Sequence, residues 1–139
     1  MKQAIVIYHS KTGTTKKYGE AIGEYLYSKG IDTHVTSTNV FRKEMLNGAD
    51  YIFFGCWTSG LMIMLQKPEQ SWVEFAKQLP DKQDPKVALF TTYKILTGSM
   101  FKNMNKELKG KFASPTLNLK ARGQFLSEKN KRDLDRFIN

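Results

Sequence analysis

Apolar residues follow two alternating patterns along this chain: short continuous runs, and sets spaced with the period of a helix. The continuous runs are typical of parallel strands buried on both faces, and they occupy residues 4–8, 51–54 and 87–90. Residues 33–36 form a shorter, more polar run, and the segment 112–119 contains Pro115. The polarity of the first segment suits an edge strand, and the second suits one because proline cannot donate to a strand ladder.

The spaced sets predict a helix after each run. The first helix carries Tyr18, Ile22, Tyr25 and Leu26 at helical spacing, and Gly30 ends it. Further helices are expected around residues 40–48, 72–79, 101–108 and 134–138. Alternation of strands and helices predicts an α/β fold, a parallel sheet with helices on both faces. At 139 residues, we expect a single domain over residues 1–139.

The composition excludes some classes of protein but does not indicate a function. Cys56 is the single cysteine, so the chain cannot form an internal disulfide. No apolar run approaches the roughly 20 residues that cross a bilayer. Met1 leads almost directly into a predicted strand, without the pattern of a signal peptide. We therefore expect no membrane span and a cytoplasmic location.

The net charge of +9 lies mainly in the second half of the chain. Residues 80–139 carry 13 basic against 6 acidic residues, and residues 1–79 carry 9 against 7. Basic residues of this half fall on outer helix faces, and no aromatic platform or nucleic-acid motif accompanies them. A solvated basic surface is the simpler explanation, and an acidic protein partner is the functional one. We expect no nucleic-acid binding.

The most informative segment is Ser10-Lys11-Thr12-Gly13-Thr14-Thr15, which connects the first strand to the first helix. Backbone N–H groups and the helix dipole favour an anion at such a helix start. Four hydroxyls add donors, Gly13 permits close approach, and Lys11 adds charge. The segment therefore predicts a phosphate site. The alternative is that Thr14 and Thr15 only cap the helix.

Two further segments leave the carboxyl ends of buried strands, where ligands of such sheets bind. They are Cys56-Trp57-Thr58-Ser59-Gly60 and Thr91-Thr92-Tyr93-Lys94. Each carries a large aromatic residue. Together with the phosphate segment they suit a flat, phosphorylated ligand.

At these residues the chain resembles the short-chain flavodoxin family over almost its whole length. Ser10 to Thr15 is similar to the family's S/T-x-T-G-x-T phosphate loop. Gly55-Cys56, an aromatic residue and Gly60 are similar to the loop against one side of the flavin ring. Tyr93, five residues before Gly98, stands where the family often stacks a tyrosine on the other side.

The resemblance implies a doubly wound sheet of order 2-1-3-4-5 that binds FMN at the point where strand order reverses. It adds Leu61 and Gly98 to the expected cofactor contacts, since the peptide Gly60–Leu61 matches one that turns toward the reduced ring. The implied function is a flavoprotein that carries single electrons between redox proteins. We expect it to have no substrate of its own and to be a monomer or weak dimer.

Two departures from the family pattern keep other functions open. Leu61 stands where relatives commonly carry an acid, and it begins an apolar stretch to Leu65. Electron-carrying flavodoxins are usually acidic, so this basic chain is expected to dock partners with acidic faces. One alternative is a flavodoxin-like reductase acting on a quinone, a tetrapyrrole or another planar acceptor over residues 61–65. The other is a flavodoxin-fold binding module without a cofactor.

Other chemistry finds little support in the sequence. A phosphatase loop needs arginine six positions after its cysteine, and Met62 stands there. His9 and His34 have no second ligand at metal spacing, so we expect no metal site. No general acid or base stands near the three segments, and we expect no catalytic residue.

Overall fold

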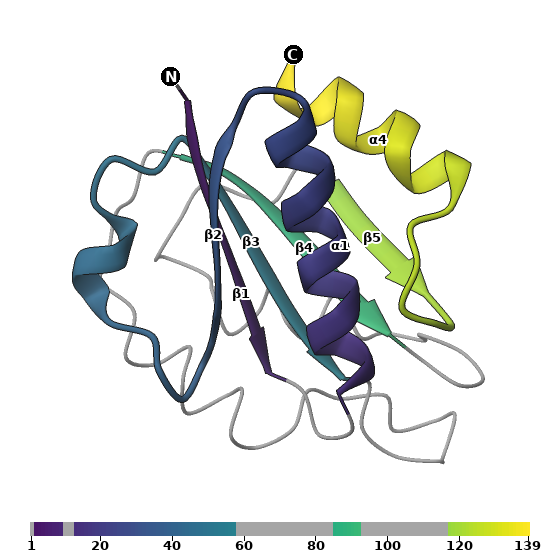
Figure 1. Cartoon of the computed structure of the whole chain (residues 1–139), viewed down its shortest axis with the longest axis horizontal. Coiled ribbons are helices and arrows are strands. Elements are labelled where there is room, and N and C mark those ends of the chain that lie inside the picture. The colour runs from purple at the N-terminus through teal and green to yellow at the C-terminus, as the bar shows by residue number, and fades with distance from the viewer. Residues whose placement is uncertain (1, 10–12, 58–84, 93–116) are drawn as a thin grey trace.

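The computed structural model describes residues 2–9, 13–57, 85–92 and 117–139, with Cys56 and Trp57 described by their backbone alone. Five strands form one sheet (Figure 1). Their bounds are Gln3–His9 (β1), Asp32–Ser37 (β2), Tyr51–Trp57 (β3), Lys86–Thr92 (β4) and Leu117–Ala121 (β5). The helices are Thr14–Ser28 (α1) and Glu128–Ile138 (α4), and Lys43–Leu46 is a 3-10 helix (η1).

All four strand pairings are parallel, and the order is β2-β1-β3-β4-β5. The order expected from the resemblance is thereby confirmed. The polar run at 33–36 and the segment with Pro115 were expected at the edges, and β2 and β5 are the edge strands. Residues 112–116 lie outside the described residues, and β5 extends to Ala121.

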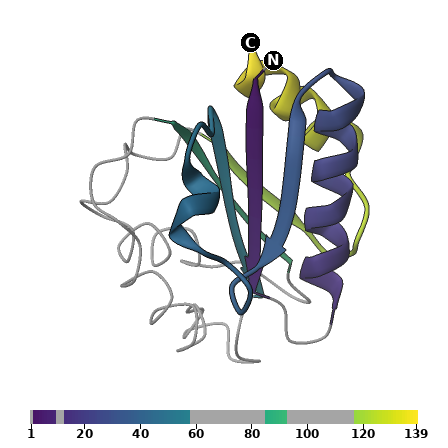
Figure 2. The ribbon, with the colours of Figure 1, turned by 60° about the vertical axis from the view of Figure 1, so that its left-hand side comes forward.

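The described helices cover one face of the sheet. Figure 2 shows α1 and α4 on one side and η1 on the other. The helix expected over 40–48 is the single 3-10 turn η1, and Gly48 follows it with φ 79°. The helices expected around 72–79 and 101–108 lie outside the described residues.

Side chains that alternate along the strands enter two hydrophobic clusters, one on each face. Ile5, Ile52 and Leu89 belong to the cluster beneath η1, whereas Val6, Phe53 and Phe90 belong to the cluster beneath α1 and α4. Because both faces are covered, successive strand residues are all apolar. This explains the continuous runs in the sequence. Among the described residues, no helix is long and apolar enough to cross a membrane.

Small residues let α1 lie close to the sheet. Thr15, Gly19 and Gly23 recur every four residues and are buried, so they form one face of the helix. A Cβ on Gly19 would lie 3.4 Å from Val6 of β1 and 3.5 Å from Phe90 of β4. One on Gly23 would lie 2.6 Å from Val35 of β2. The helix therefore crosses from β4 to the edge strand β2.

The carboxyl end of α1 is a turn with two backbone hydrogen bonds. Ile31 N–H donates to the carbonyl of Leu26, and Gly30 N–H donates to the carbonyl of Tyr27. Gly30 has φ 85°, the left-handed conformation that such a Schellman turn requires. The expected end of the helix at Gly30 is confirmed.

Two tyrosine hydroxyls join α1 to α4. Tyr18 donates to Asn130 Oδ1 over 2.8 Å, and Tyr25 donates to Asp135 Oδ1 over 2.7 Å. Asn130 also completes the capping box of α4, because its backbone N–H donates to Ser127 Oγ and its side chain accepts from Ser127 N–H. The start of α4 therefore depends on a residue buried beneath α1.

Gly55 provides the room that the Phe90 ring occupies. A Cβ at Gly55 would overlap Cδ2, Cε2 and Cζ of that ring, which is completely buried and packs on Tyr18 with centroids 5.9 Å apart. We expect Gly55→Ala to lower the free energy of unfolding by about 1–3 kcal/mol, since a packed core resists added volume. Urea unfolding measures it. Gly123→Ala is the control, because a Cβ there meets no atom of the described residues within 4 Å, and equal losses in both variants would contradict the packing argument.

Tyr18 makes stability depend on pH in the alkaline range. Burial, and to a smaller extent the Asp133 carboxylate, raises the pKa of Tyr18 above its ordinary value. The unfolded chain ionises this hydroxyl near pH 10, before the folded chain does, so the stabilisation is complete below that pH and is lost above it.

Tyr18→Phe tests this dependence. At pH 7 we expect it to lower the free energy of unfolding by about 1 kcal/mol through loss of the bond to Asn130. As pH rises above about 10, the advantage of the wild type over the variant should shrink. Denaturant unfolding at a series of pH values measures the difference in unfolding free energy at pH 7 and its decrease at higher pH. An advantage that is constant to pH 11 would show that the hydroxyl does not titrate as described.

Candidate functional site

Three strand ends meet at one edge of the sheet. His9 of β1 is paired with Cys56 of β3, and Trp57 of β3 is paired with Thr92 of β4. The chain segments that begin at residues 10, 58 and 93 therefore leave from neighbouring strands, at the carboxyl ends (Figure 1). This is the edge at which ligands of doubly wound sheets bind.

Only some of the expected cofactor contacts lie among the described residues. The structure describes Gly13 and the side chains of Thr14, Thr15, Thr91 and Thr92. Of Cys56 and Trp57 it describes the backbone alone. The remaining expected contacts lie outside the described residues, and they are Ser10, Lys11, Thr12, Thr58, Ser59, Gly60, Leu61, Tyr93, Lys94 and Gly98. The apolar stretch at 61–65 lies outside them as well.

The turn into α1 is built on Gly13. This residue is the N-cap and has φ 92° and ψ −13°, a left-handed conformation that side chains disfavour. Its carbonyl accepts the N–H of Lys17 over 3.0 Å, which is the first bond of the helix. Thr14 and Thr15 follow the cap, and no side chain among the described residues caps this helix. The alternative that these two threonines cap the helix is therefore wrong.

The electrostatics of this turn favour an anion. The first turn of α1 holds no acidic residue, and Lys16 and Lys17 are exposed within it. Acidic side chains normally stabilise a helix start, whereas lysines there add to the positive end of the dipole. The backbone, the dipole and the lysines thus all present positive potential. Among the described residues, no atom lies within 4 Å of the place where a Cβ on Gly13 would go.

Two of the expected contact residues meet in the structure. Thr15 Oγ1 lies 2.6 Å from Thr92 Oγ1, and the two residues are 0% and 2% exposed. The neighbouring Thr91 is also buried, and its hydroxyl donates to the carbonyl of Thr92 over 3.3 Å. The start of α1 and the end of β4 are therefore joined by a buried hydroxyl pair.

Sequence analysis missed this pairing, since it assigned both threonines to the ligand separately. They are 77 positions apart, and no local signal connects them. It also treated His9 as a lone side chain. His9 Nδ1 lies 3.1 Å from Thr38 Oγ1, so the end of β1 contacts the segment that follows β2. The sequence offered one signal for this contact, which was the position of a histidine at the end of a predicted strand with a parallel neighbour.

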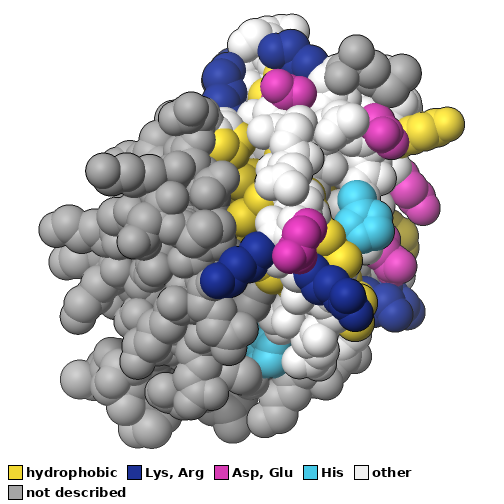
Figure 3. All heavy atoms as spheres, turned by 90° about the vertical axis from the view of Figure 1, so that its left-hand side faces the viewer, with side chains coloured by type: hydrophobic (Ala, Val, Ile, Leu, Met, Phe, Trp, Pro, Cys, Tyr) yellow, Lys and Arg dark blue, Asp and Glu magenta, His cyan; other side chains and the backbone are white. Residues whose placement is uncertain are grey.

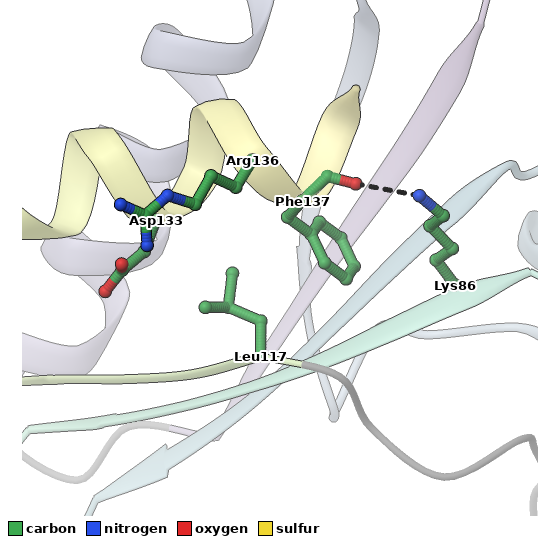
Figure 4. Close-up of a pocket in the computed structure, with 5 residues that line it drawn as sticks. All are labelled: Lys86, Leu117, Asp133, Arg136 and Phe137. Atoms are coloured by element: carbon green, nitrogen blue, oxygen red, sulfur yellow. Dashed lines mark hydrogen bonds between the residues drawn. The ribbon is translucent and has the colours of Figure 1, made fainter.

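A cavity of about 400 Å³ lies at the opposite edge, between the start of β4, the start of β5 and the end of α4 (Figure 4). Lys86, Leu117, Asp133, Arg136 and Phe137 line it. Lys86 Nζ donates to the carbonyls of Phe137 and Asn139, over 3.2 and 3.3 Å, at the negative end of the α4 dipole. The lysine therefore holds the end of α4 in place, far along the strands from the anion-favouring turn.

Comparisons with known proteins agree with the fold. The family model described as flavodoxin matches residues 6–133. A flavodoxin from Maridesulfovibrio salexigens is 34% identical over 61 residues, which are 43% of this chain and 42% of that protein. The matched segment thus spans about two-fifths of the length of this curated relative.

Solved structures match over nearly the whole chain. The two-electron reduced flavodoxin of Megasphaera elsdenii has a TM-score of 0.75 at 19% identity and covers 96% of each chain. A flavodoxin from the domain Archaea has a TM-score of 0.65 at 24% identity, and covers 97% of this chain and 92% of its own. A short-chain flavodoxin associated with a bacterial microcompartment has a TM-score of 0.74 at 15% identity, and covers 99% and 94%. At these sequence identities, the structural likeness shows that this chain shares the fold of those proteins.

Proposed function

The chain belongs to the flavodoxin family of FMN-containing electron carriers, and from this premise we propose that it binds FMN at the carboxyl edge and carries single electrons between redox proteins. The observation that carries the proposal is the start of α1. It combines a glycine N-cap with φ 92°, an absence of acid in the first turn and two exposed lysines. These features suit a phosphate group better than they suit a helix start alone.

The residues present fit the phosphate of FMN. In the proposed complex the segment from Ser10 to Thr15 holds the phosphate, with the helix N–H groups and the hydroxyls as donors. None of the described residues lies within 4 Å of the place of a Gly13 Cβ, so none of them blocks the approach of a ligand to the backbone there. Lys16 and Lys17 contribute favourable potential from the exposed side of the helix.

The ring of FMN is proposed to lie between the segments that follow β3 and β4. Trp57 and Thr92 end these neighbouring strands in register, which supports a single slot for a flat group. Trp57 and Tyr93 are proposed to face the ring, and the other proposed contacts are the rest of Cys56–Leu61, Thr91, Thr92, Lys94 and Gly98. Aromatic side chains would exclude water from the ring. When bound, FMN supplies the electron chemistry, and the protein holds and tunes it.

Redox partners with acidic docking faces fit the charge distribution. Lys120 and Arg122 are exposed at the carboxyl end of β5, on the same edge as the proposed cofactor site. In contrast, the face seen in Figure 3 carries basic and acidic side chains interspersed among its described residues. A positive rim beside the cofactor would steer an acidic partner to that edge. The cytoplasmic location stays a prediction.

Gly13→Ala tests the phosphate site, with Gly30→Ala as a matched control. Both glycines belong to the ends of α1 and have φ of 92° and 85°, and in the described part of the chain nothing lies within 4 Å of where their Cβ atoms would go. Both variants should lose about 1–2 kcal/mol of stability from left-handed strain. Only Gly13→Ala should weaken FMN binding, by about tenfold, because it distorts the turn that presents the helix N–H groups.

Flavin fluorescence titration of the apoprotein measures the dissociation constants for FMN and for riboflavin. We expect one FMN per chain and much weaker binding of riboflavin, which lacks the phosphate. Equal weakening by the two glycine variants would place the phosphate elsewhere. A wild-type protein without FMN affinity would instead be a cofactor-free binding module, and rapid turnover of a quinone by the loaded protein would favour a reductase.

A further inference from the structure

The buried hydroxyl pair of Thr15 and Thr92 suggests a role for Thr92 other than direct contact with the ligand. We propose that Thr92 is a positioning residue: its hydroxyl holds that of Thr15 in the orientation that serves the phosphate of the bound flavin. The inference rests on the proposed function. It changes the expected role of Thr92 from a direct cofactor contact to a residue that acts through Thr15.

The geometry makes Thr92 a rigid support. It is the last residue of β4, between β3 and β5, and it is paired with Trp57 on one side and Ala121 on the other. Thr15 lies two residues after the Gly13 cap, in the first turn of α1. The 2.6 Å bond between the hydroxyls therefore ties the turn at the start of the helix to the carboxyl end of an interior strand of the sheet.

Counting protons shows why the direction of this bond matters. Each threonine hydroxyl has one proton, and either oxygen of the pair can be the donor. If Thr15 donates to Thr92, it has no proton left for a phosphate oxygen. If Thr92 donates to Thr15, the Thr15 proton remains for the phosphate. A bound anion selects the second arrangement, and the bond from Thr92 then polarises the Thr15 hydroxyl and strengthens its donation.

Packing alone does not require two hydroxyls here. The pair continues a contact that is otherwise apolar, since Phe90, two residues before Thr92, lies beneath Gly19 and Tyr18 of α1. Two valines of nearly the same shape would fill this place, because replacing both partners of a buried hydrogen bond is often nearly neutral. The two hydroxyls are therefore best explained by the direction of their hydrogen bond, in which Thr92 donates to Thr15 and leaves the Thr15 proton for the phosphate.

The experiment measures dissociation constants of FMN and riboflavin for the wild type and four variants, by fluorescence titration of the apoproteins. In Thr92→Val, FMN binding should weaken by about three- to tenfold, the usual range for one lost hydrogen bond. Riboflavin binding should stay within about twofold, because the loss concerns the phosphate. Thr92→Ser keeps the hydroxyl and should restore most of the FMN affinity.

Tyr18→Phe is the matched control. It also removes a buried hydroxyl bond of α1, the one to Asn130, but from the side of the helix that faces α4. If loosening of α1 in general weakened the site, this variant would lower the preference for FMN over riboflavin as Thr92→Val does. We expect it to leave that preference unchanged.

A double variant, Thr15→Val with Thr92→Val, separates folding from binding. It leaves no hydroxyl of the pair without a partner, so its melting temperature without ligand should lie above that of Thr92→Val. Its preference for FMN should nevertheless stay low. A wild-type preference in Thr92→Val, an equal loss of both ligands, or a serine variant as weak as the valine variant would overturn the inference. A wild-type protein that binds no FMN would overturn the proposed function with it.

Discussion

The close contact between α1 and the sheet is the constraint on which the rest of the structure depends. Thr15, Gly19 and Gly23 present only small groups to the strands, so the helix backbone lies near β4, β1 and β2 in turn. The approach fixes where the helix begins. Its first turn stands over the carboxyl end of β4, which is where the hydroxyls of Thr15 and Thr92 meet.

The same helix organises the second layer of the fold. Tyr18 reaches across to Asn130, which in turn caps α4, and Tyr25 reaches Asp135 one turn further along α4. Phe137 of α4 then packs edge-on against Phe53 of β3, with centroids 5.3 Å apart. Strain or loosening at α1 would therefore spread to α4, whereas the start of α1 has its own anchor in Thr92. This separation lets the phosphate turn be tuned without rebuilding the core.

The start of α1 departs from the pattern that would stabilise a helix by itself. A glycine cap offers no side-chain acceptor, and the lysines at 16 and 17 are unfavourable beside the positive end of the dipole. Local rules are most often broken at functional sites, where a ligand supplies what the chain omits. In the proposed function, the phosphate of FMN would supply the negative charge and the acceptor oxygens that this turn lacks.

Particular elements show how far the sequence could be interpreted without the structure. The runs at 51–54 and 87–90 are strands because only residues buried on both faces of a sheet are apolar without interruption. Gly30 ends α1 because its left-handed φ completes a Schellman turn, a signal that is entirely local. The segment at 40–48 was expected to be a helix, but its only regular element is the 3-10 turn Lys43–Leu46, and Phe41, Met45 and Ala49 pack against the core around it. The capping role considered for Thr14 and Thr15 was wrong, because the residue before them is the cap.

By itself, the sequence determined the order of the described strands and helices, the burial of the central strands on both faces, and the place of the segment at 10–15 between the first strand and its helix. These properties depend on periodicity and on neighbouring residues, which are visible in one dimension. Only the tertiary structure decided that Thr15 meets Thr92, that Tyr18 supports the cap of α4, and that Gly55 makes room for Phe90. Each of these contacts joins residues far apart in the chain, and its existence depends on the distance at which a helix packs on a sheet.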